Sequence, residues 1–246
     1  MTESETPNAV NRWYALAGTG QWQRIPEAAG PTYTRHEPAG TRVVTADDYA
    51  REIGEQVAQR GVLKWEYSAF ADNDIAVVVL RALGTPRGDI STVQAFRVAD
   101  DKLVETWVGP FAPVAWPLPG DVGEGDGDAN GRLLRRWYEE MYEQRRFAEL
   151  APELCGPVFT RHEAAGTSDV TAEEYGARLA SSVGQRDEVE GRTPLIENYR
   201  VFTSGDRVGV IGTSGRRGSY VQVWRVKDNK LVESWWSGFA GVNWEI

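Results

Sequence analysis

The two histidines of the chain, His36 and His162, are its sharpest candidates for chemistry, because they occupy matching places in two TRHE segments, 34–37 and 160–163. An imidazole takes and returns a proton near neutral pH, which enolisation, aldol-type ring closure and dehydration all require. The alternative is that each histidine hydrogen-bonds and stabilises the turn that follows it, made with Gly40 or Gly166. Both interpretations stay open on the sequence alone.

Aromatic residues are the second candidate feature. The chain has ten tryptophans in 246 residues, and many aromatic positions recur in step between its halves. Most such side chains pack in a core, but aromatic walls also suit a flat hydrophobic ligand that an amide such as Gln94 or Gln222 would orient. The residues expected to bind a ligand are Trp13, Tyr14, Trp65, Tyr67, Gln94, Phe96, Trp107 and Phe111 in the first half, and Trp137, Tyr138, Tyr199, Gln222, Trp224, Trp235 and Phe239 in the second.

These residues recur because the chain is an internal duplication. Residues 31–60 match 157–186 without a gap at an offset of 126, and 91–116 match 219–244 at an offset of 128. Two matched blocks in the same order indicate two copies of one fold unit. We expect domains at 11–119 and 132–246, joined by a linker over 120–131 that is rich in Gly and Asp.

The elements that must position the candidates follow the same order in each copy. Helical spacing of apolar residues is seen around 13–16 and 132–150, and a strand leads into each TRHE segment. Thr45 and Thr171, each followed three residues later by an acid, predict capping boxes that open a helix. Four strands then follow in each copy, connected by short polar turns. Helices followed by an antiparallel meander indicate an α+β fold.

Composition excludes several classes of protein. The formal net charge of −9 disfavours a general grip on nucleic-acid phosphates, and no apolar run is long enough to cross a bilayer. The single cysteine, Cys155, excludes an internal disulfide and a cysteine-based zinc site and fits a reducing cytoplasm. We expect it to be a small buried hydrophobe, the alternative being a reactive thiol. Since no phosphate loop, dinucleotide fingerprint or metal cluster is present, no cofactor is implied.

The closing segments FRVADDKLVETW (96–107) and WRVKDNKLVESW (224–235) resemble the ending typical of SnoaL-like proteins, which include polyketide cyclases, within the nuclear-transport-factor-2-like superfamily. The resemblance covers nearly all of both halves. It implies two tandem cone-shaped domains, each a curved antiparallel sheet wrapped by about three helices, with a pocket at the wide end. Since single-domain relatives commonly pair sheet to sheet, it also implies an intramolecular pseudo-dimer, either monomeric or further dimerised.

The resemblance also bears on the site residues. By similarity to ketosteroid isomerase, the TRHE segments look like the counterpart of the stretch that holds its general base, which implies that His36 and His162 face a cavity. The aspartate that SnoaL-type cyclases use is replaced by Phe111 and Phe239, so that mechanism does not carry over. Trp13 and Trp137 stand about where the isomerase has its oxyanion-stabilising tyrosine. Tyr14 and Tyr138 lie next to them.

Two carboxylate pairs are candidate partners of the histidines. Glu37 and Glu163 are adjacent to them in sequence, but adjacent residues of a strand face opposite ways. Glu105 and Glu233 belong to the closing segments, for which we favour a structural salt bridge.

Two functions fit these observations. The first is a cofactor-independent enzyme of natural-product metabolism that cyclises, isomerises or dehydrates a hydrophobic, polyketide-like intermediate, with His36 or His162 as acid or base. The second is a non-catalytic binder that sequesters or carries such a molecule, for example in self-resistance. In a third possibility one half is active and the other is a scaffold. The family that the chain resembles includes both enzymes and binding-only members, so the fold does not choose between the first two functions.

Overall fold

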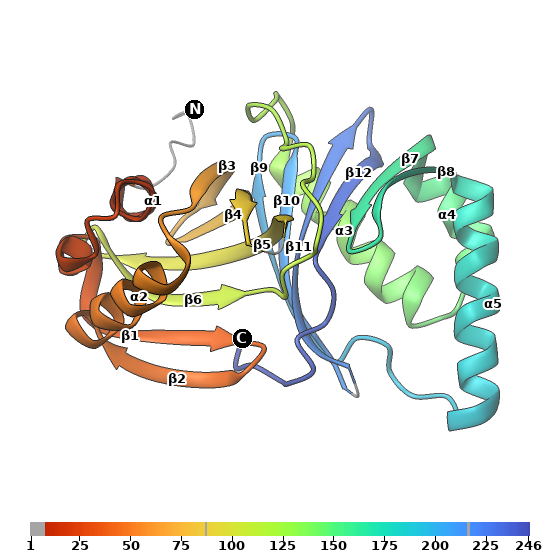
Figure 1. Cartoon of the computed structure of the whole chain (residues 1–246). Coiled ribbons are helices and arrows are strands. Elements are labelled where there is room, and N and C mark those ends of the chain that lie inside the picture. The colour runs from red at the N-terminus through yellow and green to blue at the C-terminus, as the bar shows by residue number, and fades with distance from the viewer. Residues whose placement is uncertain (1–7, 87, 216) are drawn as a thin grey trace.

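The computed structural model describes residues 8–86, 88–215 and 217–246, and it contains two α+β domains in tandem (Figure 1). The elements of domain 1 are α1 (Asn8–Thr19), η1 (Trp22–Glu27), β1 (Ala29–Glu37), β2 (Gly40–Thr45), α2 (Ala46–Arg60), β3 (Lys64–Asp72), β4 (Ile75–Thr85), β5 (Gly88–Ala99) and β6 (Lys102–Val108). Those of domain 2 are α3 (Gly127–Arg136), η2 (Trp137–Tyr142), α4 (Phe147–Leu154), β7 (Cys155–Glu163), β8 (Gly166–Thr171), α5 (Ala172–Glu190), β9 (Asn198–Ser204), β10 (Arg207–Ser214), β11 (Gly218–Lys227) and β12 (Lys230–Trp236).

Each domain has one six-stranded sheet, in the order β2-β1-β6-β5-β4-β3 in domain 1 and β8-β7-β12-β11-β10-β9 in domain 2. Neighbouring strands are antiparallel except β1 with β6 and β7 with β12, which are parallel. The α+β fold is confirmed, and the sheets differ from the expected antiparallel ones only in this parallel pair, which makes them mixed. Turn residues specify the hairpins, whereas the pairing of the first strand with the last depends on how the whole sheet curls.

Threonine caps begin the long helix of each domain, as the sequence predicts. The backbone N–H of Asp48 donates to Thr45 Oγ1 (3.0 Å) at the start of α2, and that of Glu174 donates to Thr171 Oγ1 (3.1 Å) at the start of α5. The capping box is complete at Thr171, whose own N–H donates to Glu174 Oε2 (3.0 Å). These caps satisfy donors that the first helical turn leaves unpaired.

The helical pattern over 132–150 is interrupted in the structure. α3 is followed directly by η2, a turn of π-helix, and the chain then bends at Arg145 (φ 61°) before α4 begins. α3 itself starts at Gly127, inside the segment expected to be a linker, with Asp126 as its cap. Upstream of it, Gly123 and Asp206 exchange hydrogen bonds, so this connection lies against the β9–β10 turn.

The two sheets pack against each other, and the long helices α2 and α5 lie at opposite ends of the molecule (Figure 1). Valines of β4 and β5 and aliphatic residues of β10 and β11 share one buried cluster between the sheets. Gly209 allows this approach, because a Cβ there would lie 2.8 Å from Val77 Cγ2. Burial of this apolar surface joins the domains as a pseudo-dimer within one chain.

Reciprocal hydrogen bonds from tryptophans close this interface. The indole N–H of Trp116, beyond β6, donates to the carbonyl of Glu163 in domain 2 (2.9 Å). The indole N–H of Trp244, beyond β12, donates to the carbonyl of Glu37 in domain 1 (3.1 Å). Each domain therefore binds the strand β1 or β7 of the other through its C-terminal segment.

Candidate functional site

Strand β1 presents different side chains to its two faces. Tyr33, Arg35 and Glu37 line a cavity in domain 1, while His36 between them points to the sheet–sheet interface. This follows from the two-residue repeat of a strand, in which alternate side chains share a face. Arg35 and Glu37, the neighbours of His36 in the sequence, therefore line the cavity, and His36 does not.

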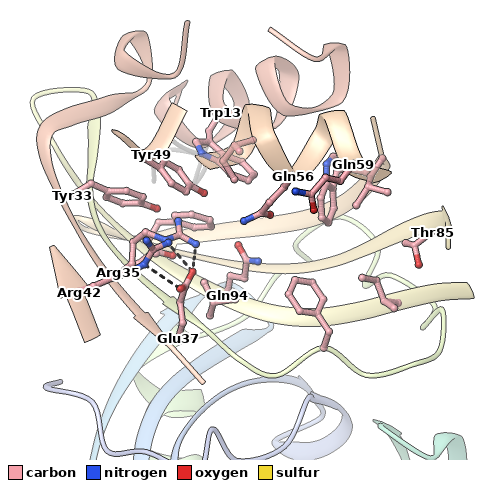
Figure 2. Close-up of a pocket in the computed structure, with 18 of the residues that line it drawn as sticks. Trp13, Tyr33, Arg35, Glu37, Arg42, Tyr49, Gln56, Gln59, Thr85 and Gln94 are labelled. Carbon is pink, nitrogen blue, oxygen red and sulfur yellow. Dashed lines mark hydrogen bonds and ion pairs between the residues drawn. The ribbon is translucent and has the colours of Figure 1, made fainter. Parts of the chain in front are cut away.

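The cavity of domain 1 has a volume of about 770 Å³, within the range of small-molecule sites. Its inner end lies beneath the helices, where Tyr33, Tyr49 and Trp13 are buried (Figure 2). Gln56 and Gln94 point toward each other across it, and Thr85 lies at the opposite end (Figure 2). Apolar walls with a few convergent polar groups are typical of a binding site.

The charged groups of this cavity form one cluster. Arg35 donates from Nε to Glu37 Oε1 (2.9 Å), and Arg42 Nε lies 3.5 Å from the other oxygen of that carboxylate. The guanidinium of Arg35 also lies over the ring of Tyr49, 4.2 Å from its centroid, as a cation–π contact. Burial raises the pKa of Tyr33 and Tyr49, so both phenols stay protonated at neutral pH.

Domain 2 has a corresponding cavity of about 280 Å³. Arg161, Glu163 and Tyr175 line it at the places of Arg35, Glu37 and Tyr49, and the guanidinium of Arg161 lies 4.6 Å from the ring centroid of Tyr175. No cation corresponds to Arg42, since Ser168 has its place in the repeat.

The structure places five of the eight expected binding residues of domain 1 on the cavity wall: Trp13, Trp65, Gln94, Phe96 and Phe111. Tyr14 lies behind the wall, stacked on Tyr67 at 4.3 Å, and donates from its hydroxyl to Gln94 Oε1 (3.2 Å). Trp107 lies on the opposite face of the sheet, against His36.

In domain 2, five of the seven expected binding residues line the smaller cavity: Trp137, Tyr138, Gln222, Trp224 and Phe239. Tyr199 packs on Tyr138 at 4.7 Å and donates to Glu139 Oε1 (2.6 Å). Trp235, like Trp107, lies at the interface and stacks on a histidine.

Neither histidine lines either of these two cavities. Each imidazole is 1% exposed; His36 Nδ1 lies 2.8 Å from Thr41 Oγ1, and its Nε2 lies 2.9 Å from Glu105 Oε1. His162 makes the same contacts with Thr167 and Glu233. The expectation that these side chains face the cavity does not match the structure, because alternation along β1 and β7 turns them to the interface. Their contacts and those of Glu105, which also pairs with Arg97 at 2.8 Å, are structural.

Sequence reasoning missed Tyr33, Arg35, Arg42 and Tyr49 as cavity residues, and it treated Glu37 only as a partner of the histidine. A signal was present, because Arg35 and Glu37 recur as Arg161 and Glu163 in the matched block. Their spacing from Tyr33 also puts all three on one face of a strand.

Three further features were considered in the part of the chain that the structure describes: the cysteine, metal-binding clusters and membrane-spanning helices. Cys155 is buried beside α4, and burial raises the pKa of its thiol to about 12, which makes it a buried hydrophobe as expected. Residues 8–86, 88–215 and 217–246 contain no group of three or more histidine, cysteine or acidic side chains placed to hold a metal ion. In the same ranges, every helix is too short or too polar to span a membrane.

Comparison with known proteins finds similarity among solved structures. No protein-family model matches the sequence, and no curated protein matches it. A SnoaL-like polyketide cyclase from Agrobacterium tumefaciens is similar over 44% of this chain and 91% of its own, with 11% identity and a TM-score of 0.37. IdmH from Streptomyces antibioticus (42% and 91%, 14% identity, TM-score 0.36) and an NTF2-like protein of unknown function from Cytophaga hutchinsonii (46% and 94%, 14% identity, TM-score 0.36) are similar as well.

Proposed function

We propose that domain 1 binds a hydrophobic small molecule that carries a hydrogen-bond acceptor. The observation that carries this proposal is the cavity of about 770 Å³ in which Arg35 and Gln94 converge between aromatic walls. The indole N–H groups of Trp13 and Trp65, which line the same cavity, are buried without a hydrogen-bond partner. Because an unpaired buried donor costs free energy, this wall favours a ligand that offers a carbonyl, carboxylate or similar group.

Gln94 is the orienting group for that acceptor. Its Oε1 accepts the hydrogen bond from Tyr14, which leaves the amide N–H groups to donate toward the cavity. Tyr14 is thus a positioning residue that acts through Gln94. Arg35, fixed by Glu37 and by the ring of Tyr49, supplies positive charge at the inner end of the cavity.

Fluorescence titration tests this proposal with two aromatic probes. The first, 1-anilinonaphthalene-8-sulfonate, carries acceptor oxygens, and the second, N-phenyl-1-naphthylamine, lacks the sulfonate. We expect Gln94→Leu to weaken binding of the sulfonate probe about three- to tenfold, the cost of one hydrogen bond, and to affect the neutral probe less. The matched control is Gln222→Leu in domain 2, which should leave both affinities unchanged. Absence of saturable binding to the native protein, or equal effects of the two substitutions, would overturn the proposal.

A second candidate function is proton transfer to and from the bound molecule by Glu37. The observation that favours it is the position of this carboxylate on the cavity wall, with a side chain that is 21% exposed and beside Arg35. Glu37 would accept a proton from the carbon next to a carbonyl, Arg35 would stabilise the enolate, and the carboxylic acid would return the proton. Cyclisation, isomerisation and dehydration can each begin with this step.

Deuterium exchange distinguishes the enzyme from the binder. In D₂O, a general base accelerates replacement of the α-protons of 2-tetralone, which NMR follows directly. Catalysis predicts acceleration by the native protein, its loss in Glu37→Gln and its retention in the matched variant Glu163→Gln. Binding without acceleration assigns the protein a carrier or sequestering role.

A further inference from the structure

The cavities of the two domains differ almost threefold in volume although their strands follow one topology. The cavity of domain 1, about 770 Å³, is large enough for a drug-sized molecule. The cavity of domain 2, about 280 Å³, lies just below the usual volume range of small-molecule sites. The side chains on these corresponding strands differ in size as well.

Two positions of these strands carry larger, aromatic side chains in domain 2. Thr92 on β5 corresponds to Tyr220 on β11, and Val108 on β6 corresponds to Trp236 on β12. The strand registers agree with this correspondence, because Gln94 pairs with Val108 in domain 1 just as Gln222 pairs with Trp236 in domain 2. A phenol and an indole thus occupy places that a hydroxyl group and an isopropyl group hold in domain 1.

The residue that faces the first of these positions on the neighbouring strand also differs between the domains. Leu80 pairs with Thr92 across the strands of domain 1, and the position that pairs with Tyr220 in domain 2 is Gly212. A Cβ at Gly212 would lie 2.5 Å from the Tyr220 ring, so the ring rests where any larger residue would collide with it. In domain 1 the fully buried side chain of Leu80 takes up the space that the phenol fills in domain 2, so the indole of Trp236, which lies on the cavity wall as Val108 does in domain 1, is the added bulk.

A third aromatic position has the same residue in both domains but different contacts. Phe239 packs edge-on against Tyr220 (centroids 5.5 Å apart) and against Trp236 (5.2 Å). Its counterpart Phe111 lies on the wall of the larger cavity with 46% of its surface exposed. In domain 1 the phenylalanine remains, while the two rings against which its counterpart packs are absent.

From this difference we infer that the ligand of domain 1 is a flat molecule with at least two fused or linked aromatic rings. It occupies the volume beside Val108 that corresponds to the indole of Trp236 in domain 2, with an edge against Phe111 and its acceptor toward Gln94. This inference rests on the proposed binding function and adds the ligand class and its position. Domain 2 is then a partly filled copy, in which the indole of Trp236 takes the place of the ligand.

Exchange of the side-chain sets between domains tests the inference, with N-phenyl-1-naphthylamine as the probe and calorimetry reporting affinity and stoichiometry. The filled variant carries Leu80→Gly, Thr92→Tyr and Val108→Trp, and Val108→Trp alone is a milder form of it. The opened variant carries Gly212→Leu, Tyr220→Thr and Trp236→Val. Circular dichroism confirms that each variant is folded.

We expect one bound probe in the native protein, binding at least about tenfold weaker in the filled variant and in Val108→Trp, and two bound probes in the opened variant. If a folded filled variant or Val108→Trp keeps the native affinity, or the folded opened variant still binds one probe, the inference is wrong while the binding function stands. If the native protein binds no probe, the binding function itself fails. Should the triple variants not fold, Val108→Trp decides.

Discussion

The imidazole of His36 stacks on the indole of Trp107, with ring centroids 5.3 Å apart and planes inclined by 9°. His162 repeats the arrangement on Trp235 at 5.0 Å and 23°. Both pairs lie between the sheets, and the indole N–H groups of the same tryptophans donate to carbonyls of C-terminal segments, Trp107 to Glu245 and Trp235 to Pro117. The histidines therefore belong to the surface that joins the domains.

Replacement of His36 by Ala should lower stability and leave ligand binding intact. The variant loses the stack on Trp107 and the contacts with Thr41 and Glu105, at a cost of about 1–3 kcal/mol in the free energy of unfolding. Urea unfolding measures the cost, and titration with N-phenyl-1-naphthylamine measures binding. If the variant folds but no longer binds the probe, the prediction is wrong and His36 has a role in ligand binding.

The stability of domain 1 should fall in acid through Glu105. Burial raises the pKa of this carboxyl, but the hydrogen bond from His36 and the charge of Arg97 outweigh that effect and lower it overall. The contribution to stability is therefore present above the ordinary glutamate pKa of about 4.3 and is lost as the pH falls toward the lowered value. Melting temperatures between about pH 3 and 6 should decrease less steeply for Glu105→Gln than for the native protein or the exposed control Glu55→Gln. Parallel profiles would contradict this account.

The interface should influence the cavity of domain 1 through Trp244. In Trp244→Phe the carbonyl of Glu37 loses its indole donor, while Trp116→Phe removes the equivalent donor from Glu163. Each change should lower the free energy of unfolding by about 0.5–1.5 kcal/mol. Only Trp244→Phe should also weaken probe binding several-fold, because Glu37 and its partner Arg35 line the cavity that we propose binds the probe. If the two variants bind the probe equally well, the interface does not influence the cavity through Trp244.

Loss of the Thr45 cap should destabilise domain 1 without changing its chemistry. Thr45→Ala removes the acceptor of the Asp48 N–H and should cost about 1 kcal/mol in the free energy of unfolding, while Thr45→Ser keeps the oxygen and should cost less. Chemical denaturation compares the two. A full loss in the serine variant would mean that packing of the methyl group, and not capping, fixes the start of α2.

Local chemistry made much of the fold predictable. The Thr caps and the polar turns indicate where α2, α5 and the last hairpins begin and end, and the turn residues Asp100 and Asp101 adopt the left-handed angles that such a hairpin needs (φ 50° and 55°). The parallel pairing of β1 with β6 has no local signal, because it arises when the sheet curls.

The site was less predictable for a related reason. A strand pattern tells which side chains share a face but not which face becomes the cavity. The resemblance to ketosteroid isomerase implied that His36 faces the cavity, but the opposite face, with Arg35 and Glu37, lines it. Aromatic wall residues such as Trp13 and Phe96 were found because they recur in both halves. The search for recurring residues passed over positions that differ between the halves, such as Tyr220 and Trp236. Their relevance to the cavity follows only from the strand register, in which Trp236 pairs with Gln222.

The contrast between Val108 and Trp236 depends on the duplication itself. In a symmetric homodimer one gene encodes both cavities, so a substitution that closes one also closes the other. A chain with two linked copies can mutate them separately, and here one copy has become a fixed partner that contributes half of the interface. If domain 1 binds a ligand as proposed, fusion has allowed one half to keep the binding site while the other half serves the packing of the interface.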